Sequence, residues 1–481
     1  MTEQEFDRFL SDAPNILVAP AGYGKTHSIA KAVKRLHEQN EDTILVLTHT
    51  NAGITSIREK FKKEKVNSKG VSILTIAGFL QKIVHSLSKN RIEQGNNTDE
   101  FYNKLYNEAY SLFQNSRLLK FVIENSYQHI FVDEFQDCNK VQYDIIGSVT
   151  KWNVKVHCLL DPLQTIFDFE KDHPNYLSWV QRCCESSPNR VFELKTPYRW
   201  RNAKSKLECY VPIWRENIYA AITNGSANII DISKFPGVVY RDMASSQVYR
   251  YISSVISKPG NILVLHSLSQ KGNVEARGSV AMKTGYKLRL IESVDNPDFY
   301  NTAEEIDQAI DRGDSIEEIL CLILEKCKIS NSCIEQWIRN NHLVEKKGEN
   351  DAKHAAQLRQ AISTSSPALA IAQGLRVLTD VIGLKVQRIE LLSDIKKALN
   401  SSYVSNKTIK EEIELKRNLA RIQGRKVQGK VIGTTLLTKG LEADTVILLK
   451  PKDLLKDSKG MMHLYVAMTR AVNELIMIDI H

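Results

Sequence analysis

The sequence predicts an α/β protein with two parallel-sheet cores, each interrupted by a mostly helical insertion. Apolar, strand-like runs alternate with amphipathic helical segments from Asn15 to about Ser72, which is the pattern of a parallel α/β layer. Strand-like runs return from Val191 onward, whereas residues 300–428 are almost wholly helical in pattern. A chain of 481 residues is also too long for one ordinary domain.

These patterns divide the chain into four predicted parts. Each core is made of two separate segments, because a helical insertion lies between them. The parts are residues 1–77 and 127–190 for the first core, 78–126 for its insertion, 191–299 and 428–481 for the second core, and 300–427 for the second insertion.

The segment ILVAPAGYGKTHS (residues 16–28) carries the most specific local signal. An apolar run, a glycine-bearing loop and a helical segment follow one another, as the pattern G-x-x-x-x-G-K-[ST] requires, although Ala19 replaces its first glycine. Backbone amides can turn toward phosphate oxygens at such glycines. Lys25 is expected to reach the β and γ phosphates, and Thr26 to hold Mg²⁺. The residues expected to bind the nucleotide here are Ala21, Gly22, Tyr23, Gly24, Lys25, Thr26 and His27.

The segment HIFVDEFQD (residues 129–137) is an apolar strand that ends in acidic residues. Asp133 is expected to share the Mg²⁺ with Thr26, and Glu134 to act as the general base that polarises the attacking water. Two distant arginines, Arg199 and Arg470, are candidates for neutralising charge on the γ-phosphate. An isolated arginine is more often a surface charge or a helix cap, so the surrounding motifs decide between these interpretations.

Composition narrows the class of protein. The net charge is +9 and the pI about 8.9, which suits a polyanionic partner. We find no apolar run long enough to span a membrane, and the polar N-terminus is unlike a secretory signal. The eight cysteines form no C-x-x-C pair, so we expect a reducing, cytoplasmic location.

Eight short motifs together resemble those of one family. In chain order they are AGYGKT, LTHTN, ILTIAGF, VDEFQD, DPLQTIFDF, PYR, TKGLE and YVAMTRA. Their order and approximate spacing resemble the motifs of UvrD/Rep-type superfamily 1 DNA helicases, over roughly residues 4–285 and 428–481. The resemblance implies two RecA-like P-loop NTPase lobes that enclose Mg-ATP, and movement on single-stranded DNA in the 3′ to 5′ direction.

The resemblance also implies roles for single residues. Gln4 and Tyr198 resemble the residues that read and stack on adenine, Glu442 resembles a carboxylate near the ribose, and Gln136 resembles a glutamine that senses the γ-phosphate. The residues that resemble the catalytic set are Lys25, Asp133, Glu134, Gln164, Arg199 and Arg470. The residues that resemble contacts to single-stranded DNA are Thr50, Asn51, Thr75, Phe167 and Phe169.

Two functions therefore remain open. One is a DNA-dependent ATPase that translocates on single-stranded DNA. The other is an ATPase subunit that senses DNA ends and regulates a partner nuclease, because the compact build resembles the helicase-like subunits encoded beside OLD-family nucleases in Gabija-type anti-phage systems. The sequence stops at His481, shortly after Arg470, where the family continues into a strand-separating hairpin. We thus expect ATP hydrolysis without the usual means of unwinding. An inactive scaffold is disfavoured because the catalytic set is complete.

Overall fold

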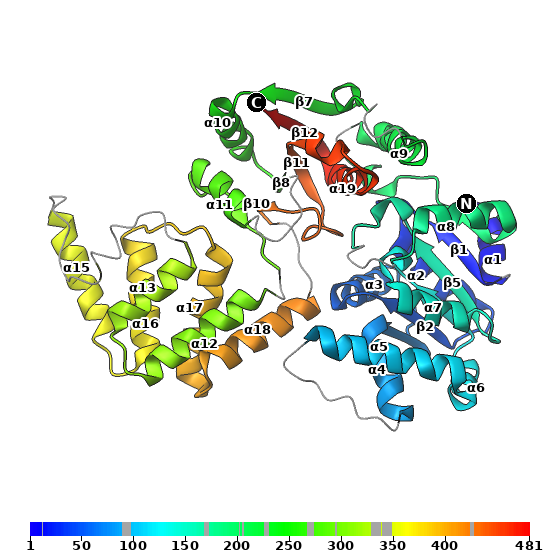
Figure 1. Ribbon diagram of the computed structural model, residues 1–481, viewed down its shortest axis with the longest axis horizontal. Helices are drawn as coiled ribbons and strands as arrows, with labels where there is room; N and C mark the ends of the chain where they lie inside the picture. The colour runs from blue at the N-terminus through cyan, green and yellow to red at the C-terminus, as the bar shows by residue number, and fades with distance from the viewer. Residues whose placement is uncertain are drawn as a thin grey trace. The chain divides into compact units, whose positions relative to one another are not determined.

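The computed structural model describes most of the chain in two compact units, and each unit is considered by itself (Figure 1). Unit 1 consists chiefly of Met1–Val239 and Pro451–Leu475, and unit 2 chiefly of Tyr240–Arg421, Lys426–Lys450 and Ile476–His481. The described residues are 1–11, 13–88, 98–167, 173–201, 203, 206–225, 230–266, 274–293, 296–328, 338, 349–423 and 428–481.

Unit 1 contains a six-stranded sheet in the order β3-β2-β4-β5-β1-β6, in which neighbouring strands are parallel. Its strands are β1 (Asn15–Val18), β2 (Ile44–Thr48), β3 (Val71–Thr75), β4 (His129–Val132), β5 (Lys155–Leu160) and β6 (Val191–Glu193). The central strands are buried along almost their whole length, as expected where helices cover both faces of a parallel sheet. The strands predicted from the first five apolar runs are confirmed.

The register brings the carboxyl ends of these strands to one edge of the sheet. Val18 lies opposite Leu160, and Thr48 lies opposite Thr75. The loops that follow the strands therefore leave the sheet side by side, which is where open α/β sheets bind their ligands. The motifs predicted after separate strands meet at this edge.

The helices of unit 1 are α1 (Glu3–Ser11), α2 (Lys25–Glu38), α3 (Asn51–Lys63), α4 (Ile76–Leu87), α5 (Thr98–Asn115), α6 (Arg117–Ser126), α7 (Lys140–Val149), α8 (Tyr176–Ser186), α9 (Leu207–Thr223) and α19 (Ser458–Met468). Figure 1 shows α2, α3 and α7 beside the unit 1 sheet. Short 3₁₀ turns η1 (Phe135–Asp137), η2 (Pro162–Gln164) and η4 (Tyr198–Trp200) follow β4, β5 and β6. The insertion predicted between the third and fourth strands is thus helical, as α4 to α6 show.

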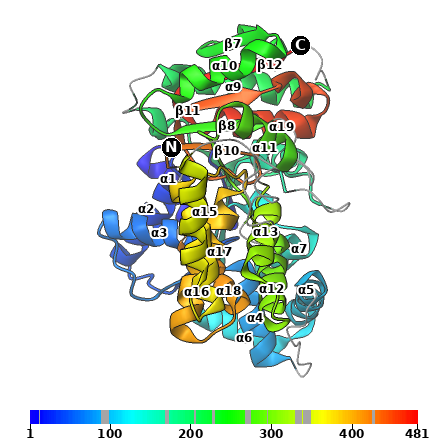
Figure 2. The same ribbon diagram turned by 90° about the vertical axis from the view of Figure 1, so that its left-hand side faces the viewer.

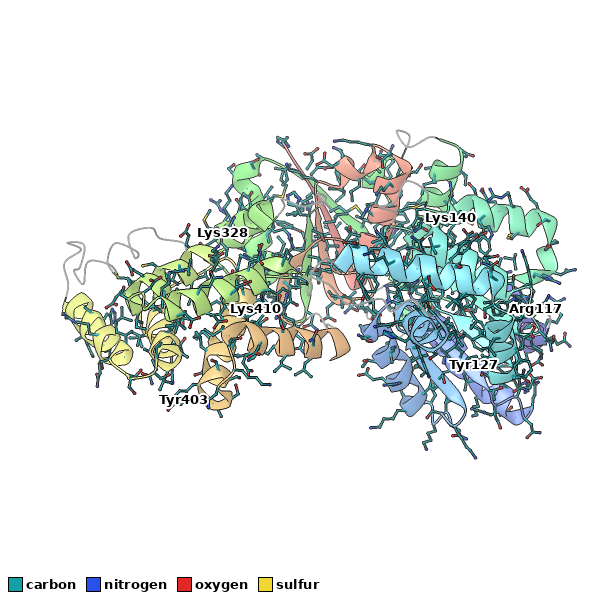
Figure 3. The ribbon with its side chains drawn as sticks, turned by 60° about the horizontal axis from the view of Figure 1, so that its bottom comes forward. Arg117, Tyr127, Lys140, Lys328, Tyr403 and Lys410 are labelled. Atoms are coloured by element: carbon teal, nitrogen blue, oxygen red, sulfur yellow. The ribbon has the colours of Figure 1, made fainter. Side chains whose placement is uncertain are left out.

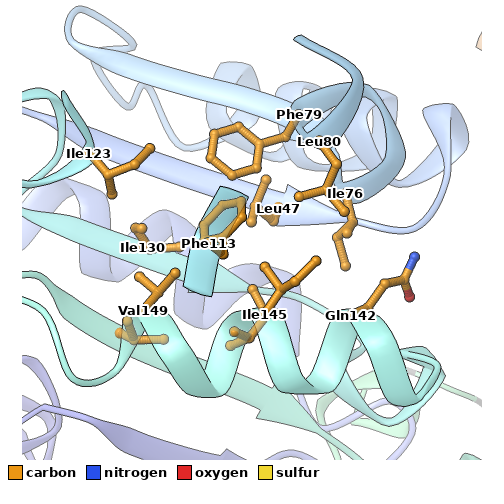
Figure 4. Close-up of a pocket in the computed structure, with 12 residues that line it drawn as sticks. Leu47, Ile76, Phe79, Leu80, Phe113, Ile123, Ile130, Gln142, Ile145 and Val149 are labelled. Atoms are coloured by element: carbon orange, nitrogen blue, oxygen red, sulfur yellow. The ribbon is translucent and has the colours of Figure 1, made fainter. Parts of the chain in front are cut away.

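Buried apolar side chains form a close-packed core against the unit 1 sheet. Leu47, Phe113 and Ile145 point toward one another from β2, α5 and α7 (Figure 4). The gap left between these side chains is about 10 Å³, which is about the least volume that holds one water molecule. This cavity is a packing defect in the core and is not the functional site.

Unit 2 has its own six-stranded sheet, in the order β7-β12-β11-β8-β10-β9. Its strands are β7 (Val238–Met243), β8 (Ile262–His266), β9 (Arg289–Leu290), β10 (Lys430–Gly433), β11 (Ala443–Leu449) and β12 (Ala471–Ile480). Within this sheet β9 pairs with β10, β10 with β8, and β8 with β11, all in parallel. The second α/β core predicted from the sequence is therefore present, and the two sheets are those of two RecA-like lobes.

The remaining described helices belong to unit 2. They are α10 (Ser245–Ile256), α11 (Val274–Lys283), α12 (Pro297–Asp311), α13 (Ile316–Lys326), α15 (Glu349–Ile362), α16 (Pro367–Arg376), α17 (Ile389–Ser405) and α18 (Ile409–Gln423). Figures 1 and 2 show α12, α13, α16 and α17 gathered in one helical bundle. In the sequence these helices follow β9 and precede β10, so the long insertion is helical as predicted. Among the described residues, no helix has the length and apolar character needed to cross a bilayer.

Candidate nucleotide site

The phosphate loop (residues 19–26) joins β1 to the first turn of α2. Gly22 and Gly24 have φ values of 76° and 95°, a region that glycine enters without steric cost. Helix α2 begins at Lys25, so its first amides have no partner within the helix and can bind an anion. The sequence prediction of a strand, a phosphate-type loop and a helix is therefore confirmed as local structure.

Lys25 lies between the two acidic residues that follow β4. Its Nζ atom is 2.5 Å from Glu134 Oε2 and 4.0 Å from Asp133 Oδ1. Lys25 and Asp133 are largely buried, whereas the Glu134 side chain is about one-third exposed. The structure thus brings together Lys25, which is predicted to be catalytic, and the strand-end carboxylates that lie more than a hundred residues away in the sequence.

The pKa shifts in this group follow from burial and charge. Burial favours the neutral form of Lys25, but Glu134 and then Asp133 outweigh it and raise the pKa of the ammonium. Burial raises the pKa of the Asp133 carboxyl to about 7, Lys25 opposes this shift, and Glu134 adds to it. One ammonium therefore faces two carboxylates in a site with little water.

This donor set fits a magnesium ion. Mg²⁺ prefers hard oxygen ligands and is usually held by one or two protein groups together with substrate phosphates. Thr26, in the first turn of α2, supplies a hydroxyl, and Asp133 supplies a carboxylate whose pKa is raised mainly by burial. Both predicted metal ligands are thus chemically suited to the ion.

Glu134 adopts an unusual backbone conformation, with φ of 54° and ψ of 42°. A residue other than glycine in this left-handed region is strained, and such strain is concentrated at functional sites. Gln136 Nε2 donates a hydrogen bond of 2.5 Å to Glu134 Oε2, and Gln136 Oε1 accepts one of 3.1 Å from the Asp161 amide. Gln136 therefore links the general-base candidate to the loop after β5.

The two arginines predicted as fingers both lie in unit 1. Arg199 donates its backbone N–H to the Gly22 carbonyl at 2.9 Å, and its Nη1 donates to the Thr469 carbonyl at 2.5 Å. Arg470 is fully buried, and its Nη2 donates to Gln164 Oε1 at 3.2 Å. The structure thus brings Arg199 to the phosphate loop and joins Arg470 to Gln164.

Tyr198 lies against the phosphate loop. A Cβ atom built on Gly24 would be 3.3 Å from Tyr198 Cδ2, and the centroid of the His27 ring is 6.4 Å from that of Tyr198. Half of the Tyr198 surface is exposed, and the Arg201 guanidinium lies over its ring, 5.1 Å from the centroid. Gln4 is exposed on α1, and Glu442 is exposed in unit 2, just before β11.

Gly22 is required by close packing as well as by its φ angle. A Cβ atom there would lie 2.8 Å from Trp200 Cζ3 and 2.9 Å from Arg199 Cβ. We expect Gly22→Ala to lower the free energy of unfolding by about 1–2 kcal/mol for the left-handed backbone and by about 1–3 kcal/mol more for overpacking. Chemical denaturation measures this loss, and Gly225→Ala is the control, because Gly225 has φ of 65° and nothing within 4 Å of its Cβ position. Equal losses in both variants would refute the packing argument.

The residues predicted to contact DNA gather at the same sheet edge. Thr50 and Thr75 cap α3 and α4, each accepting an amide hydrogen bond of 3.0 Å, from Gly53 and Gly78. Their hydroxyl protons stay available to a phosphate oxygen. Asn51 is exposed at the first position of α3. Two further candidates follow η2: Phe167, which is exposed, and Phe169, which lies outside the described residues.

Sequence reasoning gave no role to Asp161, Arg215 or Tyr465, which the structure joins by hydrogen bonds. Asp161 follows the buried strand β5 just as Asp133 follows β4, and this parallel could have identified it. Arg215 lies within α9 and Tyr465 within α19. Nothing in their local sequence points to a site, because their proximity arises only from the tertiary fold.

Comparison with known proteins agrees with this geometry. Residues 2–100 and 87–183 match the UvrD/REP helicase N-terminal domain. The chain is 28% identical over 191 residues to a protein of Acanthamoeba polyphaga mimivirus named as an ATP-dependent DNA helicase, R568. It is 25% identical over 150 residues to a DNA helicase II homolog of Mycoplasma capricolum, and 29% over 125 residues to RecBCD enzyme subunit RecB of Borreliella burgdorferi.

These alignments cover only part of each protein. They include 38%, 28% and 25% of this chain, and 26%, 20% and 11% of the three relatives in the same order. The matched residues contain β1 to β5. The N-terminal part of the chain, residues 2–183, is thus similar to the UvrD/REP helicase N-terminal domain, and the phosphate loop and the Asp133–Glu134 pair lie within the matched residues.

Proposed function

We propose that this protein hydrolyses ATP with Mg²⁺ in unit 1 and uses the energy to move along single-stranded DNA in the 3′ to 5′ direction. The observation that carries the proposal is the meeting of Lys25 with Glu134 and Asp133 beside the first amides of α2. That combination suits a bound triphosphate and an attacking water. The direction of movement is inferred from the motif resemblance.

In this proposal Lys25 changes partners during the cycle. A triphosphate on the phosphate loop would compete with Glu134 for the Lys25 ammonium, since both are anions within its reach. Glu134, freed from Lys25 and held by Gln136, would then orient the attacking water and accept its proton. When bound, Mg²⁺ supplies positive charge to the phosphate oxygens, and Thr26 and Asp133 would hold it.

Arg199 and Arg470 would stabilise the γ-phosphate during its transfer to water. Arg470 is joined to Gln164, and Arg199 is fixed to the phosphate loop through its backbone. A guanidinium near the γ-phosphate stabilises the charge that develops in the transition state. Gln164 would report whether the phosphate is present, because its amide connects Arg470 with Asp161.

Two helix N-termini support the proposed DNA contact. Helices α3 and α4 both begin at the carboxyl edge of the unit 1 sheet, after the neighbouring strands β2 and β3. Helix N-termini carry partial positive charge and free amides, so they suit backbone phosphates. Contacts of this kind do not read sequence, as movement along a strand requires.

We expect single-stranded DNA to raise the rate of ATP turnover, and the affinity for DNA to fall as salt rises, because phosphate contacts release counterions. Asn51→Ala should weaken DNA binding by about threefold to tenfold, in line with the loss of one polar contact. Asn153→Ala is the matched control, since Asn153 is exposed before β5 at the opposite edge of the sheet. Fluorescence anisotropy with a labelled oligonucleotide measures binding. A rate of ATP turnover that does not change when single-stranded DNA is added would contradict the proposal.

The alternative function, an ATPase that senses DNA ends and regulates a partner nuclease, would use the same nucleotide site. An exposed apolar stripe on α6 favours a protein partner: Leu118, Phe121 and Val122 are 59%, 64% and 40% exposed. Figure 3 marks the start of this helix at Arg117 and the residue after its end, Tyr127. A translocation assay on single-stranded DNA that carries a label at one end separates the two functions, because only a motor would move along the strand to the label.

A further inference from the structure

The carboxylate of Asp161 joins four parts of unit 1. It is fully buried at the end of β5, and its two oxygens accept five hydrogen bonds. The donors to Oδ2 are the Ala21 amide at 3.0 Å, Gln164 Nε2 at 2.9 Å and Tyr465 Oη at 3.1 Å; the donors to Oδ1 are Arg215 Nη1 at 3.1 Å and the Leu163 amide at 3.3 Å. The phosphate loop, the η2 turn that carries Gln164, and the helices α9 and α19 therefore share one hydrogen-bond acceptor.

Arg215 is the guanidinium that balances this buried charge. Its side chain is 13% exposed, and its second acidic neighbour, Glu193, is farther away at 3.9 Å and half exposed. Burial opposes the charged form of Arg215, but Asp161 and, to a smaller extent, Tyr465 and Glu193 together outweigh burial and raise the pKa of the guanidinium. The ion pair is thus buried and hydrogen-bonded, and removing one partner would leave an uncompensated charge.

Tyr23, whose role in the phosphate loop the sequence left unexplained, lies in the same environment. It is buried, and burial raises the pKa of its phenol to about 12, with opposing contributions from Arg215, which lowers it, and Asp161, which raises it. The ring therefore fills space between the loop and the Asp161–Arg215 pair.

We propose that Arg215, together with Tyr465, is a positioning residue for ATP hydrolysis: it holds the Asp161 carboxylate in place, so that Asp161 fixes both the Ala21 amide and Gln164. This inference rests on the proposed ATPase function and assigns a role to a residue of α9 that lies outside the phosphate-binding motifs. The Ala21 contact acts on nucleotide affinity, and the Gln164 contact acts on the chemical step.

Loss of Arg215 leaves a buried carboxylate without its nearest cation. A buried charge that has lost its partner is strongly destabilising, so we expect the Asp161 side chain to leave its present position. Gln164 and the Ala21 amide would then lose their shared acceptor.

The test compares Arg215→Gln with Arg215→Lys, Tyr465→Phe and a control, Arg35→Gln. Arg35 forms a bidentate pair with Asp7 at 2.9–3.0 Å on the exposed face of α2, so the control removes an arginine–aspartate pair outside the site. We expect Arg215→Gln to lower kcat roughly tenfold and to weaken binding of a slowly hydrolysed ATP analogue by about threefold. Arg215→Lys should restore part of both kcat and analogue affinity, because it returns a cation beside Asp161.

Several results would overturn the inference. One is an Arg215→Gln protein with wild-type kcat and analogue affinity; another is a loss that Arg35→Gln reproduces. If Arg215→Gln does not fold, the test is made with Tyr465→Phe and Arg215→Lys instead. Wild-type kinetics of ATP hydrolysis in both variants would refute the positioning role of Arg215 and Tyr465. A wild-type protein that hydrolyses no ATP contradicts the proposed function instead. Analogue binding then tests Arg215 separately, and affinity equal to that of Arg35→Gln would refute the inference.

Discussion

Lys25→Ala should reduce ATP turnover by about a thousandfold or more, because it removes the cation that faces the β and γ phosphates. It should also weaken nucleotide binding, since Glu134 and Asp133 then meet the triphosphate without an intervening positive charge. Glu134→Gln should stop turnover to a similar extent by removing the general base. The structure adds a sharper expectation: Glu134→Gln should bind Mg-ATP at least as tightly as wild type, because the carboxylate that competes for Lys25 at 2.5 Å is gone.

The matched control is a second lysine–glutamate pair, which joins α2 to α1. Lys31 Nζ lies 2.5 Å from Glu3 Oε1, and both side chains are exposed. Exposed pairs of this kind contribute little to stability, so Lys31→Ala and Glu3→Gln should leave turnover and affinity unchanged. Steady-state phosphate release and equilibrium binding separate the two effects. Appreciable turnover in Lys25→Ala, or weaker Mg-ATP binding in Glu134→Gln, would refute the assigned roles.

The local parts of the fold were predictable because each buried strand of a parallel sheet appears in the sequence as an apolar run. The run ILV gives β1, HIFV gives β4, and the glycines before Lys25 mark the turn into α2. Strand order was not predictable in this way, since β1 lies between β5 and β6 rather than next to β2. The strand order depends on which strands become neighbours after each helical crossover connection. The residues of a single strand do not indicate its neighbours.

The functional site likewise contains residues that the sequence could identify and residues that it could not. Lys25, Asp133 and Glu134 were identifiable because each follows a strand with a recognisable pattern, and the carboxyl ends of parallel strands converge. The Asp161–Arg215 pair was not, because it joins residues 54 positions apart through packing of α9. The strained backbone at Glu134 also left no sequence signal, since a glutamate carries no preference for the left-handed region.

Arg470→Ala should lower ATP turnover by about a thousandfold, which is the usual contribution of an arginine that stabilises the transferring phosphate. The guanidinium is 1% exposed and donates to Gln164 Oε1 and to the Val466 carbonyl. Alanine would leave both acceptors without this donor, so we also expect a loss of about 1–3 kcal/mol in the free energy of unfolding. Turnover must therefore be measured at a temperature where the variant is shown by circular dichroism to be folded.

A second buried arginine separates catalysis from stability. Arg417 in unit 2 is also 1% exposed and pairs with Glu390 and Asp394 at 3.2–3.3 Å. Arg417→Ala should destabilise the protein at least as much, because it leaves two acidic groups beside an empty space, yet the folded fraction should keep its turnover of ATP. Equal loss of turnover in both variants would show that Arg470 acts only through the fold. A loss confined to Arg470→Ala would mean that its charge acts on the phosphate, since the two arginines are equally buried and only Arg470 is joined to Gln164.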